Sequence, residues 1–110
     1  MVLVIALPLL PSCGPRPRQV VSNPDPAGKV PAIEKAVQRH DTSVIPQLVK
    51  DLDNDDPAVR FYAIYGLRKL TSQDFGYEFF LDEDQRKPYV VKWQQWLSDW
   101  QARQDKSDTR

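Results

Sequence analysis

The chain offers few side chains that could take part in covalent or metal chemistry. It contains one cysteine, Cys13, and one histidine, His40, among its 110 residues. A disulfide needs two cysteines, and a tetrahedral cysteine–histidine zinc site needs about four such ligands, so one chain can form neither. No nucleophilic side chain has a histidine base near it in the sequence, and no pair of carboxylates stands out. We therefore expect no enzymatic activity, no catalytic residue, no metal and no cofactor.

Three short patterns resemble chemical motifs, and each has a simpler structural interpretation. Residues 74–76 spell the Asp-Phe-Gly triplet of kinases, but the phosphate-binding loop and the catalytic loop are missing. We expect a turn there, with Gly76 at positive φ. The acidic residues 53–56 lack the central glycine and the final glutamate of a calcium loop, so we expect a turn and a helix cap. Residues 40–41 lack the further histidines of a phosphohydrolase metal site, and they indicate a helix end.

The charge balance removes two classes of partner. The 15 Lys+Arg and 15 Asp+Glu residues give a formal net charge of zero. Nucleic-acid binding depends on an excess of basic residues that displace counterions, so we expect no nucleic-acid partner. Strong attraction to anionic lipid head groups is disfavoured for the same reason. The length supports a single domain, and 41% hydrophobic with 27% charged residues is ordinary for a globular one.

The first residues have the pattern of an export signal. Residues 1–11 carry no charge, and their length suits the apolar region of a signal peptide rather than a membrane span of about 20 residues. The sequence Leu-Pro-Ser-Cys at 10–13 resembles the lipobox of bacterial lipoproteins. The resemblance implies a signal peptide over residues 1–12 and a lipid on Cys13. It also implies a lipid anchor on the extracytoplasmic side of a membrane of the cell envelope, periplasmic or outer-membrane.

The region that follows the signal predicts a tether and then one domain. Residues 13–28 include four prolines, each of which lacks an N–H and disfavours helix at the preceding residue. We expect this stretch to be a disordered, proline-rich tether. A helical domain is expected over residues 29–102, and a polar tail over residues 103–110.

Within the domain, apolar residues recur at the spacing of one helix face in four segments. Each segment has a proline near its start, where the missing N–H has little effect. Asp56 is expected to cap the third segment, whose two apolar faces make it the most buried helix. Gly66 within it predicts close approach of a neighbouring backbone. The four predicted helices are 30–39, 43–53, 57–70 and 86–102.

Aromatic residues dominate the end of the domain. The connection over residues 71–85 is too rich in phenylalanine and tyrosine for a solvated loop, so we expect it to fold back over an end of the helix stack. The last helix carries Trp93, Trp96 and Trp100. Their spacing predicts packing against the third helix, with Trp96 as the one that remains partly exposed.

The second and third predicted helices resemble a HEAT repeat. That family has a proline in its first helix, an acidic turn, and Val-Arg at the start of its second helix. One departure is the turn, where Asn54 replaces the usual aspartate. The resemblance implies an all-α fold, a short HEAT-like α-solenoid of about four helices with the Trp-rich C-terminal helix as a cap. It is carried by Ile45-Pro46-Gln47-Leu48-Val49, Asp56-Pro57-Ala58-Val59-Arg60, Ala63, Gly66-Leu67 and Leu70.

HEAT repeats are generic binding scaffolds, so the resemblance implies a protein–protein interaction module and no specific activity. The candidate partner-binding residues are those left over once the core is filled: Phe61, Tyr65, Arg68 and Trp96. The partner is an unidentified protein, and the oligomeric state is open. Two other functions remain open at this point, an enzyme accessory subunit or lyase-like HEAT protein, and a purely structural envelope component.

Overall fold

The computed structural model describes residues 18–108, so Cys13 and the predicted signal peptide lie outside the described residues. The described residues form helices and contain no strand, which confirms the all-α prediction. None of their helices is long and apolar enough to cross a membrane. The elements are α1 (Pro26–Gln38), the 3-10 turn η1 (Thr42–Val44), α2 (Ile45–Asp51), α3 (Pro57–Thr71) and α4 (Glu83–Asp108).

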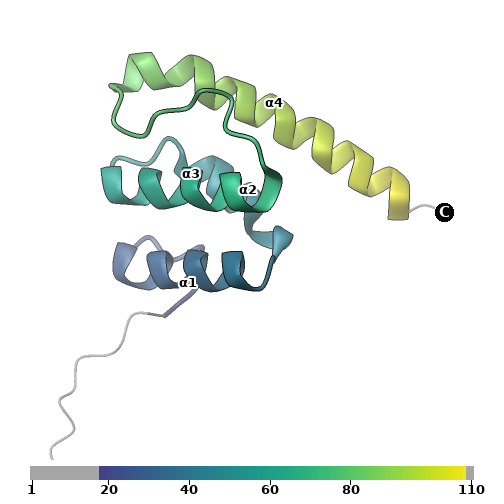
Figure 1. The fold of residues 1–110 in the computed structure, drawn as a ribbon, viewed down its shortest axis with the longest axis horizontal. Coiled ribbons are helices and arrows are strands. Elements are labelled where there is room, and N and C mark those ends of the chain that lie inside the picture. Colours follow the sequence, from purple (N-terminus) through teal and green to yellow (C-terminus); the bar gives the residue numbers. More distant parts are fainter. Residues whose placement is uncertain (1–17, 109–110) are drawn as a thin grey trace, which may run out of the picture.

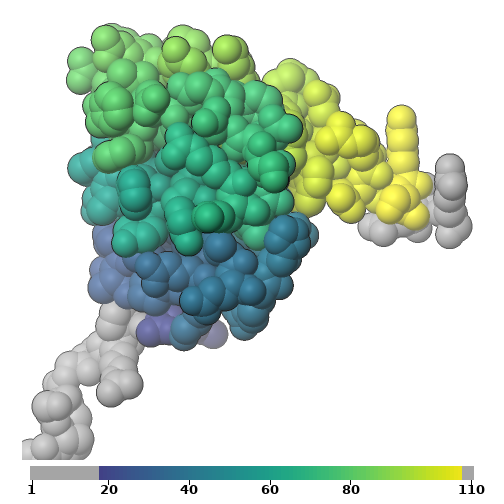
Figure 2. Space-filling view, in the orientation of Figure 1, coloured from purple at the N-terminus to yellow at the C-terminus, as the bar shows by residue number. Residues whose placement is uncertain are grey.

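Helix α3 lies in the middle of the stack, between α1 and α4 in the view of Figure 1. It packs against both α1 and α2, and α4 packs against α2. The core takes a fully buried side chain from each helix, including Ile33, Leu48, Leu67 and Trp93. The C-terminal part of α4 extends away from the rest of the molecule (Figure 2).

Aspartate caps start α1 and α3. Asp25 accepts the N–H of Ala27 at 2.9 Å, and Asp56 accepts the N–H of Ala58 at 2.8 Å. A proline follows each cap, as expected for Asp56. The predicted tether boundary was wrong, because α1 begins at Pro26 and not near residue 30. Its first turn is held by the buried ammonium of Lys29, which pairs with Asp51 at 2.8 Å.

The second predicted helix is divided in two. Asp41 accepts the N–H of Ser43 at 3.0 Å and starts η1, which leads directly into α2. Helix α2 ends at Asp51, two residues before the expected end. His40 has a φ of 52° after the C-cap of α1, in line with the predicted helix end at 40–41.

Helix α4 is longer at both ends than predicted. It starts at Glu83 and not near residue 86, so Pro88 lies inside the helix. The missing N–H of Pro88 leaves the carbonyl of Asp84 without its helical donor, and the exposure of Asp84 makes this tolerable. The helix also continues to Asp108 through the predicted polar tail. Good helix formers such as Ala102 and Arg103 favour this continuation.

The segment between α3 and α4, residues 72–82, folds back onto the helices as predicted. Tyr77 is fully buried, and its hydroxyl donates to the carbonyl of Leu52 at 2.6 Å. Trp93 Nε1 donates to the carbonyl of Asp74 at 3.1 Å, so α4 packs on this segment as well as on α2. The turn predicted at 74–76 is present, with Gly76 at φ 76°.

Gly66 provides space for side chains of the two neighbouring helices. A Cβ at this position would lie 2.9 Å from Leu48 Cδ1 and 3.2 Å from Ile33 Cγ2. The sequence-based expectation that a neighbouring backbone approaches Gly66 was therefore wrong, because side chains of the neighbouring helices fill the space. The expectation that α3 is buried on two apolar faces holds only in part, since the face with Ala63 and Leu67 is buried but on the other face Ile64 is buried and Phe61 is exposed.

Candidate functional site

Five aromatic side chains of α3 and the 72–82 segment form a continuous run, here called the aromatic ridge. Each ring meets the next edge to face, with centroid separations of 5.2 to 6.3 Å. This is the geometry that aromatic pairs prefer, so the rings support one another. In order along the run, the ridge is Tyr65, Tyr62, Phe61, Phe79 and Phe80.

The ridge is exposed at Phe80, which ends it, and at Phe61, in its middle. Phe80 is 65% exposed and Phe61 is 43% exposed, although both are large apolar side chains. The predicted contact residues Phe61 and Tyr65 both belong to the ridge. They are four positions apart in α3, so they lie on one side of the helix. Sequence reasoning missed Phe80. The aromatic residues of the connecting segment were all expected to pack against the helices, and no local sequence pattern distinguishes the exposed Phe80 from the buried Tyr77.

Arg60 holds the 72–82 segment in place beneath the ridge. Its guanidinium donates from Nε to the carbonyl of Phe79 at 2.9 Å. Its Nη1 donates to the carbonyls of Asn54 at 2.7 Å and Asp55 at 2.9 Å. Arg60 is itself buried, so these three bonds join the α2–α3 turn to the exposed aromatics through one side chain.

Arg68 lies beyond Tyr65 on α3 and is tied to the same segment. Its Nη2 donates to the carbonyl of Tyr77 at 3.3 Å, and its Nε lies 3.5 Å from Asp74 Oδ2. The Arg68 and Asp74 side chains are both largely exposed, so this ion pair contributes little to stability. The structure thus brings three of the four predicted contact residues, Phe61, Tyr65 and Arg68, onto α3.

Trp96 belongs to a different surface. Its ring stacks on Trp100 at 5.8 Å and meets Trp93 edge to face at 5.4 Å, all within α4. Among residues 18–108, no ring contact joins it to the aromatic ridge. Trp93 is fully buried and Trp96 and Trp100 are partly buried, so the expected partial exposure of Trp96 is confirmed and Trp100 shares it.

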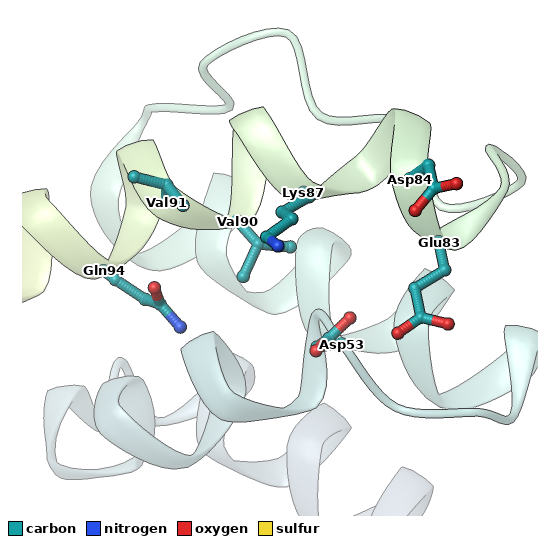
Figure 3. A pocket seen from close by; sticks show the side chains of 7 residues that line it. All are labelled: Asp53, Glu83, Asp84, Lys87, Val90, Val91 and Gln94. Atoms are coloured by element: carbon teal, nitrogen blue, oxygen red, sulfur yellow. The ribbon is translucent and has the colours of Figure 1, made fainter.

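Acidic residues from two distant segments gather near the start of α4. A cavity of about 280 Å³ lies between the end of α2 and α4, and Figure 3 shows the carboxylates of Asp53, Glu83 and Asp84 on one side of it. Val91 and Gln94 line the other side (Figure 3). Buried Arg86 joins the two segments, with Nη2 3.9 Å from Asp53 Oδ1 and Nη1 donating to the carbonyl of Leu81 at 2.6 Å.

We call this region the acidic corner. It comprises Asp53, Asp55 and Asp56 of the α2–α3 turn and Glu78, Asp82, Glu83 and Asp84 before and at the start of α4. No group of its carboxylates, and none elsewhere in residues 18–108, is arranged to hold a metal ion. The described surface therefore places exposed aromatic rings near a concentration of carboxylates, of which Asp53 lies near Arg86 and shares a cavity with Lys87.

Comparison with known proteins adds no relative to this picture. No family model, no curated protein and no solved structure matches the chain.

Proposed function

We propose that this chain is a lipid-anchored HEAT-type repeat protein that binds another protein in the cell envelope. The observation that carries the proposal is the exposure of Phe61 and Phe80 within a run of aromatic rings that pack edge to face. Exposed aromatic side chains that already sit in a fixed packing lose little conformational entropy when a partner covers them. Aromatic residues are also enriched among the side chains that dominate binding energy.

The packing of the helices supports the HEAT-type interpretation. Helix α1 contacts α3, α2 contacts α3, and α4 contacts α2, which is the neighbour-by-neighbour pattern of stacked helical repeats. Arg60, which matches the family's arginine, donates to carbonyls of the turn between the two helices. Trp93 buries its ring between α4 and the 72–82 segment, which supports a capping role for α4.

The anchor rests on the sequence pattern at residues 10–13. A lipid on Cys13 would leave residues 14–25 as the connection to α1, because α1 begins at Pro26. The five residues before α1, 21–25, are already held at their start, since the Lys29 ammonium donates to the carbonyl of Val21 at 2.7 Å. The free part of the tether would then be shorter than residues 13–28.

Site-specific photo-crosslinking in the native host tests the binding function. A benzophenone amino acid replaces Phe80 or Tyr65 in the full chain, and exposed Glu34 on α1 is the control position. We expect an adduct of one defined mass at the two ridge positions and none at Glu34.

Two other crosslinking results would contradict the proposal. Equal adducts at all three positions would indicate collisional contact, and their absence at the ridge would remove the interaction surface. Size-exclusion chromatography of each variant checks that the fold is intact. We expect it to be intact, because all three positions are partly or fully exposed.

A further inference from the structure

We infer that the exposed end of the aromatic ridge binds a basic segment of the partner protein, one in which lysine or arginine flanks an apolar side chain. The inference rests on the proposed binding function and adds the chemistry of what is bound. It comes from the position of the acidic corner beside Phe80.

Negative charge is concentrated in two short segments of a chain that is neutral overall. Seven of the 15 acidic residues fall within 53–56 and 78–84, and these two segments contain no lysine or arginine. The α2–α3 turn and the 72–82 segment are joined by Arg60, which donates to the carbonyls of Asp55 and Phe79. Phe80 therefore lies next to the acidic turn, and Glu78 and Asp82 flank it along the chain.

Nearby cations leave much of this charge exposed. Arg60 and Arg86 are buried and direct N–H groups at backbone carbonyls, although Arg86 also pairs with Asp53 at 3.9 Å. The exposed Lys87 lines the cavity together with Asp53, Glu83 and Asp84 (Figure 3), so the carboxylates of Asp55 and Glu78 are the ones farthest from a neighbouring cation along the chain. The exposed side chains of Glu78 and Glu83 form no hydrogen bond or ion pair with residues 18–108. They are free to meet a cation from a partner.

Helix capping explains only part of the acidic corner. Asp56 caps α3, and Glu83 and Asp84 in the first turn of α4 interact favourably with its dipole. Asp55 and Glu78 have neither role. Their exposure beside a 65% exposed phenylalanine is what a basic, partly apolar ligand would match.

The chemistry of the corner selects this occupant over a lipid surface. Carboxylates at the rim attract ammonium or guanidinium groups, and the face of Phe80 adds a cation–π contribution. Lys87 already shares the cavity beside the corner with the Asp53, Glu83 and Asp84 carboxylates (Figure 3), so the basic groups of a partner would meet the exposed Asp55 and Glu78 beside Phe80. An anionic membrane surface would repel the same carboxylates.

A peptide titration tests the inference. The probe is a short synthetic peptide with a central leucine and two lysines on each side, and the comparison peptide has glutamine in place of every lysine. Amide resonances of the isotopically labelled chain report the location of binding. We expect the lysine peptide to shift the resonances of Phe80 and Glu83, and the glutamine peptide to leave them in place.

Two variants and a matched control separate site binding from general charge. Phe80→Ala, and the pair Glu78→Gln with Glu83→Gln, should each weaken binding about threefold or more. The pair Glu34→Gln with Asp99→Asn changes the net charge equally at exposed positions elsewhere, and should bind like the wild type. Equal weakening by the control pair, or shifts spread over α1, would overturn the inference.

The failure of this inference is distinguishable from the failure of the binding function. A partner crosslinked at Phe80 through a segment without lysine or arginine would leave the function in place and overturn the inference. A dimer in sedimentation that the Glu78→Gln, Glu83→Gln pair abolishes would identify a second copy as the occupant and would also overturn it.

Discussion

Lys29 and Asp51 form a buried ion pair that joins α1 to α2. Lys29 Nζ lies 2.8 Å from Asp51 Oδ2 and 3.0 Å from Oδ1, and the two residues are only 2% and 3% exposed. The same ammonium donates to the carbonyl of Val21, and Gln47 donates to Asp51 at 3.2 Å. One charged cluster thus holds the segment before α1, α1 itself and α2 together.

The buried pair predicts an asymmetric response to mutation. Asp51→Asn leaves the Lys29 charge buried without its counterion, so the free energy of unfolding should fall by about 3 to 5 kcal/mol. Replacing both residues, as Lys29→Met with Asp51→Leu, should restore most of that loss, because no charge then remains to be desolvated. Urea unfolding followed by tryptophan fluorescence measures both, and an equally large loss in the double variant would contradict the prediction.

Tyr77 predicts a loss of stability at alkaline pH. Burial raises the pKa of Tyr77 from 10.0 to about 12. Because the folded state holds the proton more tightly, this contribution to stability is complete below pH 10 and is lost as the pH rises toward 12. Tyr77→Phe should lower stability at neutral pH by about 1 to 2 kcal/mol, since the carbonyl of Leu52 loses its donor.

The measurement is unfolding at a series of pH values for the wild type, Tyr77→Phe and the control Tyr65→Phe. The alkaline decline should be shallower in Tyr77→Phe alone. An identical decline in all three proteins would show that another group is responsible.

Gly66→Ala should destabilise the fold even though alanine favours helix. The helix gain is about 1 kcal/mol, but the new Cβ would lie 2.9 Å from Leu48 Cδ1 in a fully buried site. Overpacking of this kind costs about 1 to 3 kcal/mol, so we expect a small net loss. Adding Leu48→Val removes the clashing methyl, so the double variant should lose less stability than the sum of the single changes.

Arg60→Lys should loosen the exposed end of the aromatic ridge. Lysine keeps the charge but cannot direct its donors at three separate carbonyls in the fixed geometry of a guanidinium. We expect faster hydrogen exchange over residues 78–82 and a loss of about 1 to 2 kcal/mol in stability. Arg68→Lys is the matched control, because its ion pair is exposed, and it should leave both quantities nearly unchanged.

Cys13→Ser tests the proposed anchor. In the native host we expect the wild-type chain to lose residues 1–12 and to carry acyl chains on Cys13, and to sediment with membranes. The serine variant should keep its full-length mass, because no thiol is available for lipidation. An unmodified wild-type chain in the soluble fraction would rule out the anchor, and intact-mass spectrometry distinguishes the two results.

Local signals in the sequence were sufficient for most of the helices. Asp56 with Pro57 marked the start of α3 correctly, and the apolar spacing placed Leu48 and Leu67 in the core. The errors were at helix ends. Pro88 was expected in a first turn, but an extra turn precedes it because Arg86 is buried there and bonds to the carbonyl of Leu81. A helix gains an additional turn where tertiary contacts stabilise that turn.

The sequence by itself determined the all-helical class and the main apolar faces, because helix periodicity and capping act within a few residues. Only the tertiary structure decided that Lys29 meets Asp51, that Phe80 stays exposed while Tyr77 is buried, and that two acidic segments converge. These relationships join residues far apart in the chain. They depend on how whole helices pack, and no local spacing encodes that.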